Sequence, residues 1–169
     1  MDDDRGVRGR AALQSVLFLV VAPGTVAGLL PWLITGWSGS SWDGVRGVGA
    51  ALGWLLITAG SAVLVHAFAL FVLEGLGTPA PIAPTRSLVV TGTYRWVRNP
   101  MYLAVTAVIV GQALLFASVA LAIYAVVVAT AFVTFVNLYE QPTLTRQFGA
   151  DYEAYLRTVP GWWPRRPRS

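Results

Sequence analysis

The longest apolar stretch of this chain runs from Met101 to Tyr139 and contains no charged residue. A helix needs about 20 apolar residues to cross the hydrocarbon core of a bilayer. The stretch is too long for one ordinary span and just long enough for two, so it predicts a tight helical hairpin that turns near Ala117 and Ser118. Pro100 precedes it and suits the first turn of a helix, where the missing N–H of proline costs no hydrogen bond.

Two earlier apolar runs, at about 11–34 and 48–73, predict two further spans. Dividing the hairpin into 101–117 and 118–139 gives about four transmembrane helices in one domain, residues 1–169. The first run is longer than the apolar core of a signal peptide, so we expect it to be retained. The composition also indicates a membrane protein, because 56% of the residues are hydrophobic and only 12% are charged. In soluble domains about 25% of the residues are charged. The predicted fold class is an all-α integral membrane protein.

The arginines predict the orientation of these spans. All 12 basic residues are arginine. With four spans, the N-terminus, the 74–100 connection and the 140–169 segment lie on one side of the membrane, and this side holds every arginine except Arg46. Arginine-rich loops stay on the cytoplasmic side of a membrane. We therefore expect both termini and the 74–100 connection to be cytoplasmic, in a polytopic protein of the bacterial inner (plasma) membrane.

The segment after Glu140 is amphipathic and predicts a short helical region that follows the last span. Apolar residues recur in it at near-helical spacing, namely Leu144, Phe148, Tyr152, Tyr155 and Leu156. Gly149 interrupts the pattern, which predicts two short helices in place of one. Trp162 and Trp163 are followed by three arginines, a composition typical of an interfacial anchor.

Composition also limits the partners. The chain has no cysteine, so it has neither disulfides nor a thiol nucleophile. His66 is the single histidine, so we expect no metal; we interpret it as a packing residue of the second span, with a site role as the alternative. The arginines flank apolar spans and form no soluble basic face, which argues against nucleic acid. Their guanidinium groups favour membrane lipids or a carboxylate substrate.

Three short blocks lie at or near the arginine-rich side of the predicted bundle. They are GLGTPAP at 75–81, LVVTGTYRWVRNPMYL at 88–103 and YEQPTLTRQFGADYEAYLRTVP at 139–160. Each block alone is a weak signal, but their spacing is specific. Over about 75–164 they resemble the isoprenylcysteine carboxyl methyltransferase and phospholipid methyltransferase superfamily of integral membrane enzymes. The resemblance implies S-adenosylmethionine as cofactor and methyl transfer to a lipophilic small-molecule acceptor.

The resemblance also implies a cavity around the segment RNPMY. In the superfamily this segment lines the cofactor and substrate site, so Arg98, Asn99, Pro100 and Tyr102 are expected to bind the cofactor. Tyr102 follows Arg98 by four residues, so a helix presents both side chains on one face. Taken alone, Arg98 also fits the charged flank of a span. Its guanidinium group offers several N–H donors in one plane, which suits a carboxylate as the methyl acceptor and makes Arg98 a candidate catalytic residue.

Glu140 and Gln141 close the last predicted span. By resemblance they correspond to a pair of glutamates that holds S-adenosylmethionine, and Gln141 keeps an acceptor oxygen but loses a charge. Glu140 is the second candidate catalytic residue, because a carboxylate there would take up the proton of an amine acceptor. The alternative for Glu140 is a solvated charge at a helix end.

Other residues have supporting roles in the predicted site. Gly75 and Gly77 resemble the Gly-x-Gly cofactor segment of the phospholipid methyltransferases. Tyr94 and Tyr152 are expected in the pocket, where they would stack on an adenine. Tyr155 is expected at the membrane interface instead.

Two opposing signals concern the acceptor. Asn99 replaces the histidine of the isoprenylcysteine enzymes and matches the phospholipid branch, whereas the 75–81 connection and the C-terminal tail look closer to the isoprenylcysteine branch. We predict methyl transfer to a carboxylate of an isoprenoid-linked or other lipid, reached through an apolar tunnel between spans. The alternatives are N-methylation of a phospholipid or other lipid amine, a membrane reductase of the steroid-reductase type with a nicotinamide cofactor, and a non-catalytic lipid-binding protein.

Overall fold

The computed structural model describes residues 17, 20–38, 46–74 and 88–166. All regular structure among them is helical, which confirms the predicted all-α class for these residues. The elements are η1 (Thr25–Leu29), α2 (Leu30–Thr35), α3 (Arg46–Glu74), η2 (Gly92–Arg95), α4 (Pro100–Leu115), α5 (Val119–Phe135), η3 (Val136–Glu140), α6 (Gln141–Phe148) and α7 (Ala150–Thr158). η1 and η3 are π-helical turns, and η2 is a 3₁₀ turn.

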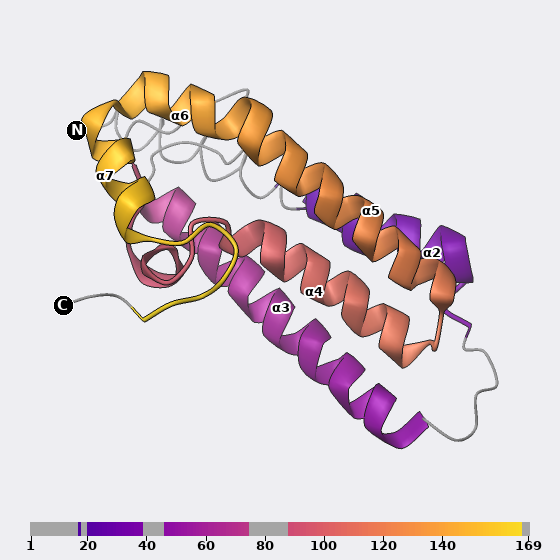
Figure 1. Cartoon of the computed structure of the whole chain (residues 1–169). Helices are drawn as coiled ribbons and strands as arrows, with labels where there is room; N and C mark the ends of the chain where they lie inside the picture. Colours follow the sequence, from indigo (N-terminus) through magenta and orange to yellow (C-terminus); the bar gives the residue numbers. More distant parts are fainter. Residues whose placement is uncertain (1–16, 18–19, 39–45, 75–87, 167–169) are drawn as a thin grey trace, which may run out of the picture.

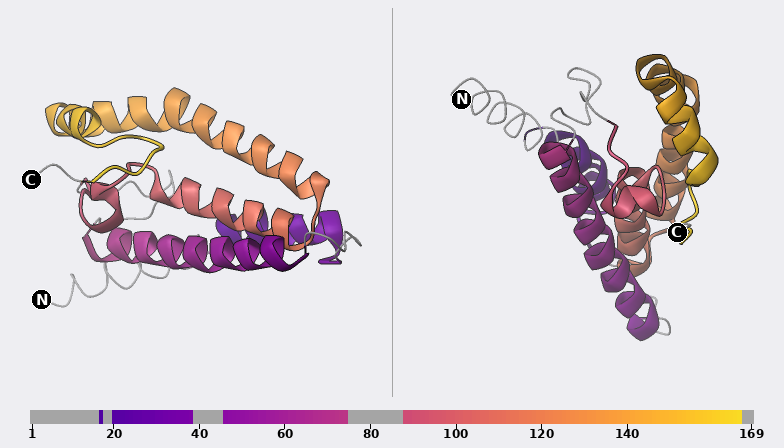
Figure 2. Two further views of the ribbon diagram at one scale, coloured as in Figure 1. Left: turned by 60° about the horizontal axis from the view of Figure 1, so that its bottom comes forward. Right: turned by 90° about the vertical axis from the view of Figure 1, so that its left-hand side faces the viewer.

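The helices α3, α4 and α5 form the body of the molecule, with α4 packed between the other two (Figures 1 and 2). η2, α6 and α7 gather at one end of this body, while α2 and the start of α3 lie at the other end (Figure 1). The arginines of η2, α6 and α7 therefore lie at the opposite end from Arg46. The predicted topology requires this separation.

Two helical stretches are long and apolar enough to cross a membrane, Gly47–Leu70 and Val119–Phe148. Val20–Thr35 and Pro100–Leu115 are apolar but shorter. The 16 residues of α4 measure about 24 Å at 1.5 Å per residue, less than the roughly 30 Å of the hydrocarbon core. Four crossings therefore stay a prediction, and residues 11–16, 18 and 19 of the first predicted span, 11–34, lie outside the described residues.

Large apolar side chains face outward on these helices, Leu55 on α3 and Val126 on α5 among them. A soluble protein rarely exposes extended apolar surface, whereas a bilayer covers it. The outer surface of the helices is thus that of a membrane-associated protein.

Glycines bring α3 and α4 into close contact. A Cβ atom on Gly53 would lie 2.7 Å from the carbonyl oxygen of Gly111, and one on Gly60 would lie 2.8 Å from that of Ala104. Small residues allow membrane helices to approach backbone to backbone. This contact fixes the start of α4, and with it the RNPMY segment, relative to α3.

The helices α4 and α5 form a hairpin at the position that the apolar stretch predicts. α4 ends at Leu115, and Ala117 adopts a left-handed conformation with φ of 47°. The side chain of Ser118 then accepts a hydrogen bond from the N–H of Leu121 at 3.3 Å, which caps α5. The buried residues between the two helices are Val105, Ile109, Ala125 and Val128.

Pro31 has no N–H to donate to the preceding helical turn, and two side chains from other helices donate to carbonyl groups of that turn. Tyr124 of α5 donates its hydroxyl to the Val26 oxygen at 2.8 Å, and Gln112 of α4 donates its amide to the Ala27 oxygen at 2.6 Å. An unsatisfied carbonyl in lipid costs several kcal/mol. The two side chains therefore fasten the first helix to α4 and α5.

Candidate functional site

The C-terminal tail fixes the loop that leads into α4. The backbone N–H of Arg98 donates to the Pro160 oxygen at 2.9 Å, and its side-chain Nε donates to the Val159 oxygen at 2.9 Å. Further along, the N–H of Arg165 donates to the Trp96 oxygen at 3.0 Å. The tail passes over the start of α4 in Figure 1. Two segments about sixty residues apart in the chain are thus joined at Arg98 and at Trp96.

Among the described residues, three buried side-chain atoms have no hydrogen-bond partner, namely Thr93 Oγ1, Arg98 Nη1 and Asn99 Nδ2, and the last two are neighbouring donors at the start of α4. The Asn99 side chain is only 6% exposed. A buried donor without a partner costs about 1–3 kcal/mol, and more when it is charged. Nearly all buried polar groups in native proteins have a partner, so this pair of donors is a candidate place for a ligand that brings an acceptor.

Gly161 packs closely against these two side chains. A Cβ atom at this position would lie 3.1 Å from Arg98 Nη2 and 3.6 Å from Asn99 Nδ2. A side chain at this position would crowd both donors, so the absence of a Cβ at Gly161 keeps them approachable from the tail. Arg98, Asn99 and Gly161 together form a small cradle for an anion, made by the start of α4 and the tail.

Glu140 meets Tyr102 next to this cradle. The Tyr102 hydroxyl donates to Glu140 Oε2 at 2.6 Å, which connects the first turn of α4 to the last residue of η3. The Tyr102 ring packs against Phe132, with ring centroids 4.8 Å apart, and against Trp162 at 6.4 Å. The hydrogen bond and the rings hold the Glu140 carboxylate on the inner side of its helix.

Tyr152 of α7 lies between the two charged groups. It is 4% exposed, and burial raises the pKa of its hydroxyl, while the charge and hydrogen bond of Arg98 oppose that rise and the charge of Glu140 adds to it. Both charges therefore act on one hydroxyl, which stays protonated at neutral pH. Tyr152 joins Arg98 and Glu140 in one cluster, and its role in cofactor binding stays a prediction.

Tyr155 corrects a prediction. The sequence placed it at the membrane interface, but it is 8% exposed, and its hydroxyl donates to the backbone oxygen of Tyr94 at 2.7 Å. Burial raises the pKa of Tyr155, and burial also raises the pKa of Tyr94 well above its ordinary value. The helical spacing of Tyr152 and Tyr155 directs both residues inward. The hydrogen bond from Tyr155 to Tyr94 connects α7 to η2.

Three predicted cofactor residues are not brought into the cluster by the described structure. The Gln141 amide donates to Asn137 Oδ1 at 3.2 Å, one turn back on its own helix. Gly75 and Gly77 lie outside the described residues. By contrast, Pro100 starts α4 and is fully buried beneath the cradle. His66 lies away from the cluster, close to Gly92, where an added Cβ would lie 2.9 Å from His66 Nε2.

Sequence reasoning missed the tail residues. Trp162 was predicted as an interfacial anchor together with Trp163, but only Trp163 is fully exposed, at 83%, whereas Trp162 contacts Tyr102. Gly161 and the carbonyl groups of Val159 and Pro160 also belong to the site. The Pro-Gly pair at 160–161 is a turn signal, which could have indicated that the tail folds back.

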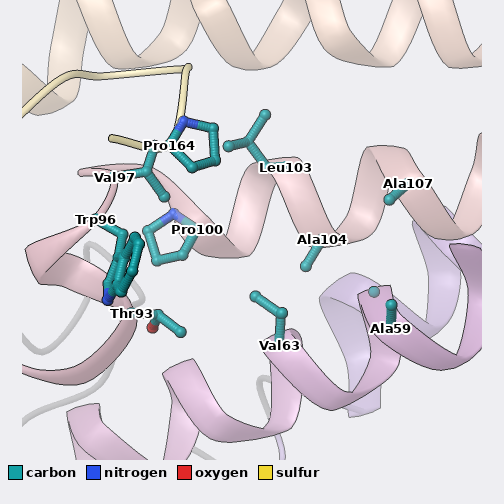
Figure 3. A pocket seen from close by; sticks show the side chains of 11 residues that line it. Ala59, Val63, Thr93, Trp96, Val97, Pro100, Leu103, Ala104, Ala107 and Pro164 are labelled. Atoms are coloured by element: carbon teal, nitrogen blue, oxygen red, sulfur yellow. The ribbon is translucent and has the colours of Figure 1, made fainter. Parts of the chain in front are cut away.

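An apolar cavity of about 350 Å³ is lined by residues of α3, of α4 and the loop before it, and of the C-terminal tail (Figure 3). Its size falls within the range of small-molecule pockets. The lining residues are Ala59, Gly60, Val63, Thr93, Trp96, Val97, Pro100, Leu103, Ala104, Ala107 and Pro164. Val97 and Pro100 flank Arg98 and Asn99 in the chain, so the cavity borders the anion cradle.

The chain matches the family model described as phospholipid methyltransferase over residues 48–151, more than half of its length. It therefore belongs to this family, which is part of the isoprenylcysteine carboxyl and phospholipid methyltransferase superfamily of membrane methyltransferases. No curated protein and no solved structure matches the chain. The matched segment contains Arg98, Asn99, Tyr102 and Glu140, whereas the tail around Gly161 lies beyond it.

Proposed function

We propose that the protein transfers the methyl group of S-adenosylmethionine to a lipid acceptor at the cluster of Arg98, Asn99, Tyr102, Glu140 and Tyr152. Family membership supports methyl transfer to a lipid. One observation carries the assignment to this cluster: the buried donors of Arg98 and Asn99 have no partner in the described structure. They adjoin the Tyr102–Glu140 hydrogen bond, so donors for an anion and a carboxylate for a cation lie together.

The residues present fit the charges of S-adenosylmethionine, which carries a carboxylate, an ammonium and a sulfonium group. Arg98 and Asn99 offer N–H donors to a carboxylate. Glu140 offers a carboxylate to a cation, and the rings of Tyr102 and Trp162 offer their negative faces to one. The buried ring of Tyr152 suits an adenine. The fit is chemical and rests on the donors and acceptors that the cluster contains.

When bound, S-adenosylmethionine supplies a methyl group on a positively charged sulfur, which the acceptor displaces in line. The protein contributes orientation and exclusion of water. Arg98 would hold an anionic acceptor in place, and such an acceptor needs no base. For an amine acceptor, Glu140 would accept the proton through Oε1, since Oε2 receives the Tyr102 hydroxyl.

Two acceptors remain candidates, each favoured by a different observation. The unpartnered donors of Arg98 and Asn99 favour a carboxylate of an isoprenoid-linked or other lipid. The match to the phospholipid methyltransferase family favours a headgroup amine. In the second case Arg98 and Asn99 would hold the carboxylate of the cofactor, and Glu140 would act as the base.

The apolar cavity between α3 and α4 would take the hydrocarbon chain of the acceptor. Its walls are almost entirely apolar, and it borders the cradle through Val97 and Pro100. The outer surfaces of α3 and α4 face lipid in this account, so a chain would enter from the bilayer. The arginine-rich end of the bundle would lie on the cytoplasmic side, where S-adenosylmethionine is available.

Methyl transfer to extracted lipids from radiolabelled S-adenosylmethionine tests the function and the acceptor together. Base-labile label would identify a methyl ester, base-stable label on a headgroup would identify an amine, and no labelled lipid would refute the proposal. Arg98→Ala should abolish transfer while the helices stay folded, because it removes the fixed counter-ion of the ligand. Glu140→Gln should chiefly weaken cofactor binding. Wild-type activity in both variants would show that the active site lies elsewhere.

A further inference from the structure

The apolar cavity has polar side chains at one end only. Among the 11 described residues that line it, only Thr93 and Trp96 carry a polar side-chain atom, a hydroxyl and an indole N–H. Thr93 belongs to η2 and Trp96 follows it, and both lie at the same end of the cavity in Figure 3, whereas Ala59 and Ala107 lie at the other end. A ligand that fills the cavity should therefore carry a hydrocarbon chain whose polar end lies at η2.

The Thr93 hydroxyl lacks a hydrogen bond. Its oxygen is buried and has no partner in the part of the chain that the structure describes. Most buried hydroxyl groups in native proteins have one. A single water is a poor substitute, because a buried water needs two to four polar partners and the side chains of the cavity offer only Thr93 and Trp96. A ligand with an oxygen atom at this end would supply the missing partner.

Hydrogen bonds hold the backbone of η2 on both sides of Thr93. The Tyr155 hydroxyl donates to the Tyr94 oxygen at 2.7 Å, and the N–H of Arg165 donates to the Trp96 oxygen at 3.0 Å. The Thr93 hydroxyl thus lacks a partner although its backbone is fixed, and only a turn of the side chain can provide one.

Such a turn of the Thr93 side chain is easy. In the structure its oxygen is covered by protein, and the residue contributes to an apolar wall. Rotation about the Cα–Cβ bond moves the hydroxyl to another staggered position, and it breaks no hydrogen bond because the hydroxyl makes none. Threonine occupies more than one of these positions in helices. A ligand in the cavity can therefore recruit the hydroxyl.

We propose that Thr93 is a specificity-determining residue whose hydroxyl donates a hydrogen bond to an ester carbonyl of the lipid acceptor, where the hydrocarbon chain begins. The inference rests on the proposed function, in which the cavity takes the chain of the acceptor. An ester carbonyl is a hydrogen-bond acceptor attached directly to such a chain. An isoprenoid chain attached through a thioether offers only a sulfur atom, which is a weak acceptor. Thr93 thus favours an ester-linked lipid over an isoprenoid-linked one.

Two matched lipids test this role. Purified protein in detergent is titrated with phosphatidylethanolamine that carries ester-linked oleoyl chains and with its counterpart that carries ether-linked chains, and native mass spectrometry measures binding. The wild type should prefer the ester-linked lipid roughly 2- to 12-fold, the effect of one neutral hydrogen bond. Thr93→Val replaces the hydroxyl by a methyl group and should remove the preference, whereas Thr93→Ser should keep it. No preference in the wild type, or a preference that Thr93→Val retains, would overturn the proposal.

Melting temperature without lipid separates recognition from a structural role. Thr93→Val should not lower it, because the substitution removes a buried hydroxyl that has no partner. A clear fall would show that the hydroxyl is bonded within the protein, against the proposal.

Two further variants serve as controls for the lipid preference. Thr130→Val changes an exposed residue of α5 whose hydroxyl donates to the Val126 oxygen at 2.9 Å, and it should leave the preference unchanged. Trp96→Phe removes the other polar atom of the cavity lining and should also leave the preference in place. Loss of the preference in Trp96→Phe but not in Thr93→Val would assign the hydrogen bond to Trp96 and refute the role of Thr93.

Lipid binding and methyl transfer are measured separately, so the two proposals can fail separately. An ester preference that Thr93→Val removes, in a protein that transfers no methyl group, would refute the proposed function and leave the recognition role intact. Methyl transfer to lipid with equal use of ester-linked and ether-linked chains would refute the role of Thr93 and leave the proposed function intact.

Discussion

Gly161→Ala would test whether the space beside Arg98 and Asn99 receives a ligand. The added Cβ would lie 3.1 Å from Arg98 Nη2, closer than ordinary contact distance. The guanidinium is held by its bond to the Val159 oxygen, and the backbone of Arg98 is held by Pro160. The side chain therefore cannot retreat without straining a hydrogen bond to a charged group, which contributes about 1.5–3 kcal/mol.

The expected loss follows from these contacts. Crowding a tightly packed site by one methyl group destabilises the folded protein by about 1–3 kcal/mol, so the melting temperature without ligand should fall modestly. The same methyl group lies where the ligand would reach the donors, and a similar cost opposes binding. Affinity for S-adenosylhomocysteine should therefore drop roughly 5- to 150-fold. The fold should be retained, because Gly161 does not adopt a left-handed backbone conformation and alanine can replace it without strain.

Titration calorimetry in detergent would measure this affinity, and melting temperature without ligand would report the fold. Gly24→Ala is a suitable control, since an added Cβ at Gly24 meets nothing within 4 Å and its backbone is helical. Equal affinity in wild-type protein and Gly161→Ala, with Gly24→Ala also unchanged, would refute the assignment of the cradle to a ligand.

Further predictions concern the cavity, the first helix and the topology. Ala59→Phe fills the cavity and should raise KM for the lipid acceptor without changing cofactor affinity. Ala62→Phe changes a residue of α3 outside the cavity lining and should leave KM and cofactor affinity unchanged. Equal effects of the two variants would refute lipid binding in the cavity. Gln112→Leu leaves the Ala27 carbonyl unsatisfied and should destabilise the protein by about 1–3 kcal/mol, seen as a lower melting temperature with cofactor affinity unchanged. Because the chain has no cysteine, Ser40→Cys should be labelled only from the non-cytoplasmic side, and cytoplasmic labelling alone would contradict the topology.

The sequence predicted the helices well because their signals are local. Apolar run length and the break near Ala117 and Ser118 depend only on neighbouring residues, and the structure turns at that place. Gly149 likewise separates α6 from α7, with φ of 52°. The two π turns were not predicted, because the sequence was searched only for regular helical and strand periods.

The site was predictable only where a motif carried it. Arg98, Tyr102 and Glu140 stand in blocks that resemble known methyltransferases, and the hydrogen bond between Tyr102 and Glu140 joins two of those blocks. The contribution of the tail depends on a contact across about sixty residues, which no local pattern encodes. Thus the bonds from Arg98 to Val159 and the space left by Gly161 became visible only in the folded structure.

The central claim is that one cluster at the start of α4 and the end of η3 binds S-adenosylmethionine. Titration calorimetry of purified wild-type protein with S-adenosylhomocysteine, beside Arg98→Ala and Glu140→Gln, tests it most directly. We expect saturable binding to the wild type, and clear weakening in both variants while their melting temperatures without ligand stay close to the wild-type value. Absence of binding to the wild type at millimolar ligand, or equal affinity in all three proteins, would contradict the claim.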